Sequence, residues 1–121
     1  MTLKECYAAL GGDYDDVLGR LPERLVQKFV LKFLSDGSYD LLCRSLEDGN
    51  REEAFRAAHT IKGVCANLGF SALLESSEQL TEALRDGAPP QPGEEELIRR
   101  VGEDYQRTVQ AIQAFQGALG A

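Results

Sequence analysis

Three residues near the middle of the chain, His59, Lys62 and Gly63, have the types and the spacing of a small reactive site. His59 is the only histidine, and the lysine and the glycine follow it by three and four positions. On a helix, residues three and four apart lie on the same face. An uncharged imidazole nitrogen is a nucleophile, a neighbouring ammonium group neutralises an incoming anion, and glycine leaves space beside the ring. The cluster therefore predicts acceptance of a phosphoryl group from a large partner.

Gly63 is the least expected residue of this cluster, because a glycine inside a helix costs about 1 kcal/mol relative to alanine. It lies at neither an end nor a core position of the predicted helix. The simplest reason for it is that something must come close to the backbone beside His59. A lone surface histidine is usually no more than a solvated side chain, but Lys62, Gly63 and Gly69 at fixed distances after it argue for a function.

The elements that would position the cluster begin with a helix over residues 51–68. Asn50 and Glu53 form a capping-box pair at its start, and Gly69 is placed to close it in a left-handed conformation. Apolar residues recur along it at steps of three and four, as in a stripe that faces a core. The stripe consists of Ala54, Ala58, Ile61, Cys65 and Leu68. His59 lies about 140° from its centre and should point to solvent.

Further helices are predicted before this one. Residues 3–10 and 14–21 form two segments that are too short to be stable alone and must pack on the rest of the chain. Residues 22–48 form one bent helix or two stacked helices, with Pro22 at the first helical position and a break near Gly37. The first half of this stretch has a wide apolar stripe that should be core. It consists of Leu25, Val26, Phe29, Val30, Phe33 and Leu34.

Two helices are predicted after the central one, over residues 71–86 and 94–118, with Ser71 as the N-cap of the first. A loop with three prolines separates them, and no segment shows the sustained alternation of a strand. We therefore expect an all-α protein, an antiparallel four-helix bundle with one or two short N-terminal helices packed on one end. Residues 1–121 should form a single domain, with the short helices in 1–21 and the bundle in 22–118. The first ten residues should dock loosely.

Composition argues against several classes of function. The net charge of −7 argues against a nucleic-acid partner. Residues 71–104 carry nine acidic and three basic side chains, whereas residues 17–70 carry seven acidic and eight basic ones. No apolar run is long enough for a membrane span, and the N-terminus has no signal-peptide core. One histidine and three scattered cysteines supply no metal site, and the cysteines are expected to be small, reduced, buried residues of a cytoplasmic protein.

The central helix also carries a family resemblance. His59-Thr-Ile-Lys62-Gly63, followed by the small residues Cys65 and Ala66 and then by Leu68-Gly69, resembles the signature of histidine-containing phosphotransfer (HPt) domains. The resemblance covers most of residues 20–118. It implies a helical bundle whose exposed histidine accepts a phosphoryl group from an aspartate of a receiver domain and passes it on. In that resemblance His59 is the phospho-acceptor, Lys62 neutralises the phosphate and Gly63 gives access.

The resemblance implies partners and further site residues as well. The partners would be response-regulator receiver domains or hybrid histidine kinases, and Mg²⁺ would come from the receiver, with no cofactor intrinsic to this chain. N-terminal helices of the family often form an apolar docking patch near the histidine. Our candidates for partner contacts are Tyr14, Val17, Leu18, Phe55 and Ala66. Thr81 stands where many members have a glutamine that faces the histidine, so Gln79 and Thr81 are both candidates to orient the ring.

The chain contains neither a P-loop motif nor the kinase signature set, so we expect a phosphoryl carrier without kinase activity of its own. We expect a standalone, monomeric module of a multistep phosphorelay. Two alternatives stay open. One is a helical adaptor that binds a receiver domain without carrying phosphate, and the other is the acceptor domain of a chemotaxis-type kinase.

Overall fold

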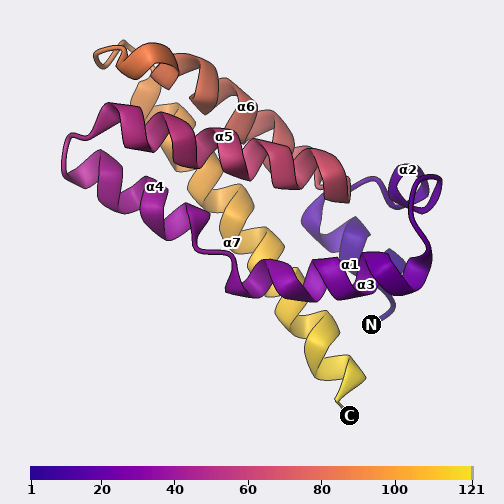
Figure 1. The fold of residues 1–121 in the computed structure, drawn as a ribbon. Coiled ribbons are helices and arrows are strands. Elements are labelled where there is room, and N and C mark those ends of the chain that lie inside the picture. The colour runs from indigo at the N-terminus through magenta and orange to yellow at the C-terminus, as the bar shows by residue number, and fades with distance from the viewer. Residues whose placement is uncertain (121) are drawn as a thin grey trace.

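The chain folds entirely into helices and turns, as the computed structural model of residues 1–120 shows (Figure 1). The α-helices are α1 (Leu3–Leu10), α2 (Tyr14–Leu18), α3 (Glu23–Lys32), α4 (Ser38–Glu47), α5 (Arg51–Leu68), α6 (Ser71–Leu84) and α7 (Glu94–Leu119). Two 3₁₀ turns, η1 (Phe33–Ser35) and η2 (Arg85–Gly87), follow α3 and α6. No strand occurs within residues 1–120, and the predicted all-α class is confirmed.

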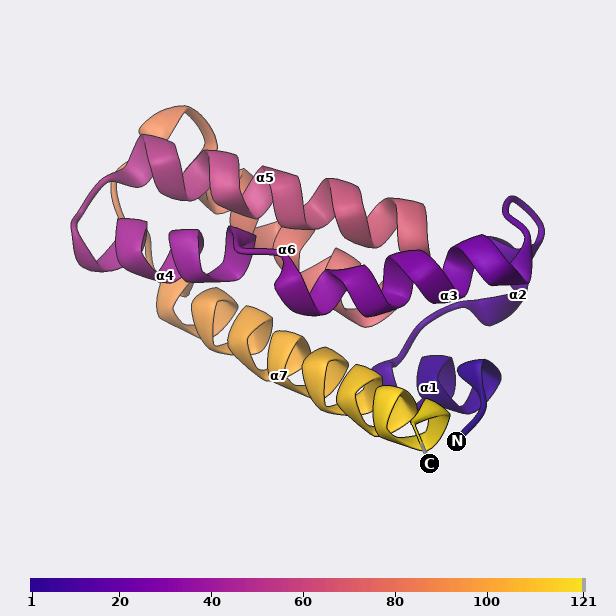
Figure 2. The same ribbon diagram turned by 60° about the horizontal axis from the view of Figure 1, so that its bottom comes forward.

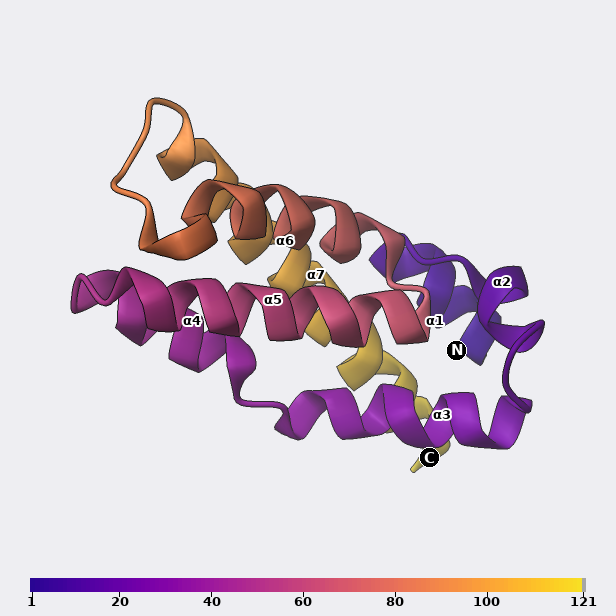
Figure 3. The same cartoon turned by 45° about the horizontal axis from the view of Figure 1, so that its top comes forward.

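The long helices lie side by side and alternate in direction along the chain (Figures 1 and 2). α5 packs between α4 and α6, and α6 packs in turn on α7. α3 and α4 follow one another along the same flank of α5 (Figure 3). α1 packs on α7 at the other end of the bundle from the proline-containing loop. None of the helices in residues 1–120 combines the length and the apolar character needed to span a membrane.

The stretch from residue 22 to residue 48 forms two helices, which decides between the two predicted alternatives. The 3₁₀ turn η1 ends α3, and Asp36 then takes an extended conformation (φ −75°, ψ 124°). The Asp36 carboxylate accepts a hydrogen bond from the backbone N–H of Ser38 at 2.8 Å, so it holds the start of α4. Pro22 is expected as the first helical residue, but its ψ of 144° is extended, so it is the N-cap and α3 begins at Glu23.

Other helix ends differ from the prediction by a few residues. α2 ends at Leu18. Ser71 is the first residue of α6 and not its N-cap, since Phe70 takes that position without a side-chain hydrogen bond. α6 ends at Leu84, because Asp86 in the following turn adopts a left-handed conformation (φ 58°) that an α-helix does not allow.

The ends of α5 are formed by local contacts that fix its length. The Asn50 side chain accepts a hydrogen bond from the backbone N–H of Glu53 at 3.2 Å, as predicted. In a complete capping box the Glu53 side chain would accept a hydrogen bond from the N–H of Asn50. Here that N–H donates to the Ser45 carbonyl instead. Gly69 ends the helix in the predicted left-handed conformation (φ 70°), and a Cβ atom there would lie only 3.0 Å from the Asp13 carbonyl oxygen. A glycine is therefore required on both counts.

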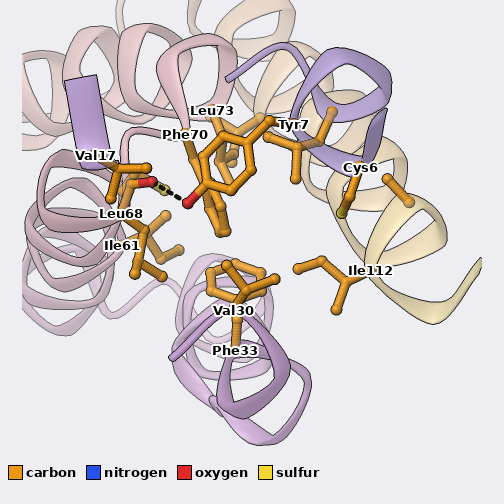
Figure 4. Close-up of a cluster of buried hydrophobic side chains, with 14 of the residues drawn as sticks. Cys6, Tyr7, Val17, Val30, Phe33, Ile61, Leu68, Phe70, Leu73 and Ile112 are labelled. Carbon is orange, nitrogen blue, oxygen red and sulfur yellow. Dashed lines mark hydrogen bonds between the residues drawn. The ribbon is translucent and has the colours of Figure 1, made fainter. Parts of the chain in front are cut away.

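The N-terminal helix belongs to the core of the molecule, in contrast to the loose docking expected from its length. Leu3, Cys6, Tyr7 and Leu10 are buried. Figure 4 shows the Tyr7 ring among the buried side chains, where its hydroxyl donates to the Leu68 carbonyl at 2.6 Å. Two backbone hydrogen bonds, Asp13 N–H to Gly69 O and Ala72 N–H to Gly11 O, join the following turn to the α5–α6 link. These contacts hold the end of α5 in place.

Candidate functional site

His59, Lys62 and Gly63 lie on the outward face of α5. His59 and Gly63 are exposed, and Lys62 is partly buried. A Cβ atom built on Gly63 would meet no atom within 4 Å, so the space beside the ring is open. The structure thus combines an exposed imidazole, an ammonium group on the same helix and open space beside Gly63, as the spacing predicts.

Phe55, one turn before His59 on α5, places its ring beside the imidazole. The two rings are nearly parallel, with an interplanar angle of 21° and centroids 6.1 Å apart. The guanidinium carbon of Arg85, from η2, lies 5.7 Å from the centroid of the Phe55 ring. Phe55 is therefore a neighbour of both the histidine ring and the Arg85 cation of η2.

Arg85 is held in turn by Glu82 of α6. Its Nε donates to Glu82 Oε2 at 3.1 Å and its Nη2 to Glu82 Oε1 at 2.6 Å. These hydrogen bonds lower the pKa of Glu82, and the charges of Arg85 and Lys62 lower it further. Glu82 therefore lies in the field of two cations, one from α5 and one from η2. We call Phe55, His59, Lys62, Gly63, Glu82 and Arg85 together the His59 cluster.

Neither of the two polar residues proposed to orient the ring does so. Thr81 is buried, and its hydroxyl donates to the Ser77 carbonyl of its own helix at 2.6 Å. The Gln79 side-chain oxygen accepts a hydrogen bond from Arg100 of α7 at 3.1 Å. Sequence reasoning placed both on the right helix but could not fix the rotation of that helix about its axis. It also missed Glu82 and Arg85, whose approach to α5 depends on the same rotation.

The five residues predicted to contact a partner differ in how far they are exposed. Ala66 is exposed, and Tyr14, Leu18 and Phe55 are partly buried, so all four present some surface. Val17 is fully buried, and the prediction that it belongs to a docking surface is wrong. Figure 4 shows its side chain beside Leu68 and Tyr7. Val17 faces inward because it packs on Gly69, where an added Cβ would lie 3.5 Å from the Val17 Cβ.

A groove of about 670 Å³ lies between α3 and the C-terminal half of α5. Its lining is mostly apolar, from Leu21, Phe29, Phe33, Val64 and Leu68. The charged residues on it are Arg20, Lys32 and Asp36. Phe29, which the wide apolar stripe assigned to the core, is 37% exposed here. Asn67 also lines the groove and lies four positions after Gly63 on α5, so the groove borders the helix face that carries His59.

A comparison with models of known protein families places the chain in one of them. The family model of the Hpt domain matches residues 32–115, a range that contains the whole His59 cluster. The match covers more than half of the chain, and the chain therefore belongs to the Hpt domain family. Domains of this family act as phosphoryl carriers in phosphorelays and interact there with receiver domains and kinases. No curated protein and no solved structure matches the chain.

Proposed function

We propose that His59 accepts a phosphoryl group from the aspartyl phosphate of a receiver domain and passes it to another receiver. The observation that carries this proposal is the exposed imidazole beside an unobstructed glycine, on the outward face of α5 in an Hpt domain. Lys62, on the same face, supplies positive charge where the phosphoryl oxygens would lie. The cluster contributes position and charge, which are the main requirements of phosphoryl transfer.

In the proposed step, the unprotonated ring nitrogen of His59, which we assign as Nε2, attacks the phosphorus of the aspartyl phosphate. A P–N bond forms while the P–O bond to the aspartate breaks, and the aspartate leaves with the electron pair as a carboxylate. The proton on the other ring nitrogen passes to water, because the ring is exposed. Lys62 offsets the charge of the phosphoryl group during the attack. Return of the group to a second aspartate is the reverse of these events.

The proposed partner is the receiver domain of a response regulator or of a hybrid histidine kinase. A receiver would bring its own Mg²⁺, so this chain has to supply only the acceptor ring and a docking surface. Ala66 and the groove between α3 and α5 offer an apolar surface next to the acceptor, with Arg20 and Lys32 on it. Positive charge there complements the acidic pocket of a receiver. We propose that the chain acts as a monomer, with one acceptor per molecule.

Transfer from a radiolabelled receiver phosphate to the wild type and to His59→Gln tests this function. We expect label on the wild type and none on the variant, with an acid-labile phosphate adduct in the intact mass of the wild type. Circular dichroism of His59→Gln controls for its fold. Equal labelling of the two proteins would exclude His59 as the acceptor. Binding of the receiver without any labelling of the wild type would instead support the non-phosphorylated adaptor.

A further inference from the structure

The orientation of an exposed imidazole must be set by its contacts, because rotation about its side-chain bonds is otherwise free. Thr81 and Gln79, the polar candidates, are hydrogen-bonded elsewhere. The contact that the structure gives the ring is the nearly parallel Phe55 ring, four residues earlier on α5. Offset parallel rings at this separation attract one another.

Phe55 is itself held by a contact from outside its helix. The Arg85 guanidinium lies over the Phe55 ring, within the range of a cation–π interaction. Glu82 fixes that guanidinium through two hydrogen bonds, which match the planar fork of an arginine. The order of groups is therefore Glu82, Arg85, Phe55 and His59, running from α6 to the acceptor.

We propose that Phe55 and Arg85 are positioning residues that orient the His59 imidazole for phosphoryl transfer. This inference rests on the proposed function of His59. With the Phe55 ring beside the imidazole and open space at Gly63, an incoming aspartyl phosphate meets the ring in a restricted orientation. Such restriction raises the rate of transfer within the docked complex, because fewer ring orientations have to be lost at the transition state.

A kinetic comparison of Phe55 variants tests the proposal. Phe55→Leu keeps an apolar side chain but removes the aromatic face, and Phe55→Tyr keeps both. We expect Phe55→Leu to lower the rate constant at saturating receiver about three- to tenfold, with the receiver concentration at half-maximal rate unchanged. Phe55→Tyr should transfer at close to the wild-type rate. An increase in that concentration alone would show Phe55 to be only a docking residue and would overturn the proposal.

Arg85 has a matched control in the chain. Arg99 pairs with Glu96 three residues before it, just as Arg85 pairs with Glu82, and both arginines are exposed. Arg99 also pairs with Glu103, so Arg99→Gln removes the same charge and the same kind of pair as Arg85→Gln, together with one further exposed pair. We expect Arg85→Gln to slow transfer at saturation about two- to fivefold and Arg99→Gln to leave it unchanged. Equal rates for the two variants would exclude a role for Arg85.

The ring itself gives a readout that does not depend on transfer. Because His59 is the only histidine, its ring signals in a nuclear magnetic resonance spectrum need no assignment. We expect the ring protons of His59 to shift in Phe55→Leu, as they leave the ring current of the phenyl group, and to keep their positions in Phe55→Tyr. Unchanged ring protons in Phe55→Leu would contradict the stack. An unlabelled wild type would refute the acceptor function, whereas a labelled wild type with equal Phe55→Leu kinetics would refute only the positioning role.

Discussion

Gly63 lies one turn after His59, and a Cβ atom built on it would meet no other atom within 4 Å. An alanine there costs no packing, and glycine weakens a helix interior by about 0.5–1 kcal/mol. We therefore expect Gly63→Ala to raise the free energy of unfolding by about that amount. Gly63→Gln should keep the helicity of the protein but slow phosphoryl transfer about tenfold or more, because its side chain occupies the space beside the ring. Urea unfolding and transfer rates measure the two effects.

Gly117 provides the control for this prediction. It is an exposed glycine of α7, and an added Cβ would likewise meet nothing within 4 Å. Gly117→Gln should therefore transfer at the wild-type rate. A Gly63→Gln protein that matches it would show that open space at position 63 has no part in the reaction.

At the scale of residues, the sequence predicts the part of the site that lies on one helix. His59, Lys62 and Gly63 are three and four positions apart, so the geometry of any α-helix brings them together. Glu82 and Arg85 come from the next helical segment, and their approach to Phe55 depends on how α6 is rotated and where it ends. A single sequence does not fix that rotation, and the prediction named Gln79 and Thr81 instead.

The proline-containing loop is joined to the bundle by a contact that links three elements. Arg51, at the start of α5, donates to the Ala88 carbonyl and to both carboxylate oxygens of Glu94 at the start of α7. The side chains of Arg51 and Glu94 are 17% and 9% exposed. From the sequence alone Glu94 is only a favourable negative charge in the first turn of a helix, because nothing in the sequence pairs residues 43 positions apart.

Removal of Arg51 should destabilise the protein strongly. Arg51→Leu leaves the Glu94 carboxylate buried without its cation, which costs about 3 kcal/mol or more. The double variant Arg51→Leu with Glu94→Leu should recover part of this loss, because no charge is then left unpaired. Urea unfolding measures both. Arg99→Gln breaks two exposed pairs on α7, with Glu96 and Glu103, and should cost about 1 kcal/mol or less. A similarly small loss for Arg51→Leu would contradict a structural role for the buried pair.

At the scale of elements, the sequence predicts helices well where the end signals are local. α5 has the predicted bounds, because Asn50 and Gly69 act on the helix that they adjoin. Errors arise where a boundary depends on distant contacts or on a neighbouring turn. Phe70 replaces Ser71 as the N-cap of α6, and the predicted helix 71–86 includes Asp86, whose left-handed conformation lies two residues past the end of α6.

At the scale of the whole molecule, the N-terminal helix α1 packs into the core and contacts the end of α5. Tyr7 and Leu68, which share a buried hydrogen bond, are 61 positions apart. The predicted core lacked this partner, because short helices give no sequence signal of where they dock. The family match to residues 32–115 also begins after α1. The structure therefore adds a part of the core that neither helical periodicity nor the family signature located.

This core holds titratable groups that must remain uncharged in the folded protein. Burial raises the pKa of the Cys6 thiol to about 11 and that of the Cys65 thiol to about 12, and it also raises the pKa of Tyr7. In the unfolded chain a thiol loses its proton at about pH 8.5. Above that pH the unfolded state binds fewer protons than the folded state, so the free energy of unfolding falls as the pH rises. The stabilisation is complete below about pH 8.5 and is lost progressively toward pH 11–12.

Each buried thiol should contribute a slope that approaches about 1.4 kcal/mol per pH unit near pH 10 and falls again as the pH reaches its pKa in the folded protein, about 11 for Cys6 and about 12 for Cys65. Cys65→Ala removes one of them, and we expect its free energy of unfolding to fall less steeply with pH than that of the wild type. Val26→Ala, at a buried position without a titratable group, should lower the free energy of unfolding equally at every pH, which separates the effect of a cavity from that of the proton. Urea unfolding at several pH values between 7 and 11 gives these slopes. If the free energy of unfolding fell with pH equally steeply for Cys65→Ala and the wild type, the Cys65 thiol would ionise without unfolding. The thiol would then be accessible to water in the folded protein.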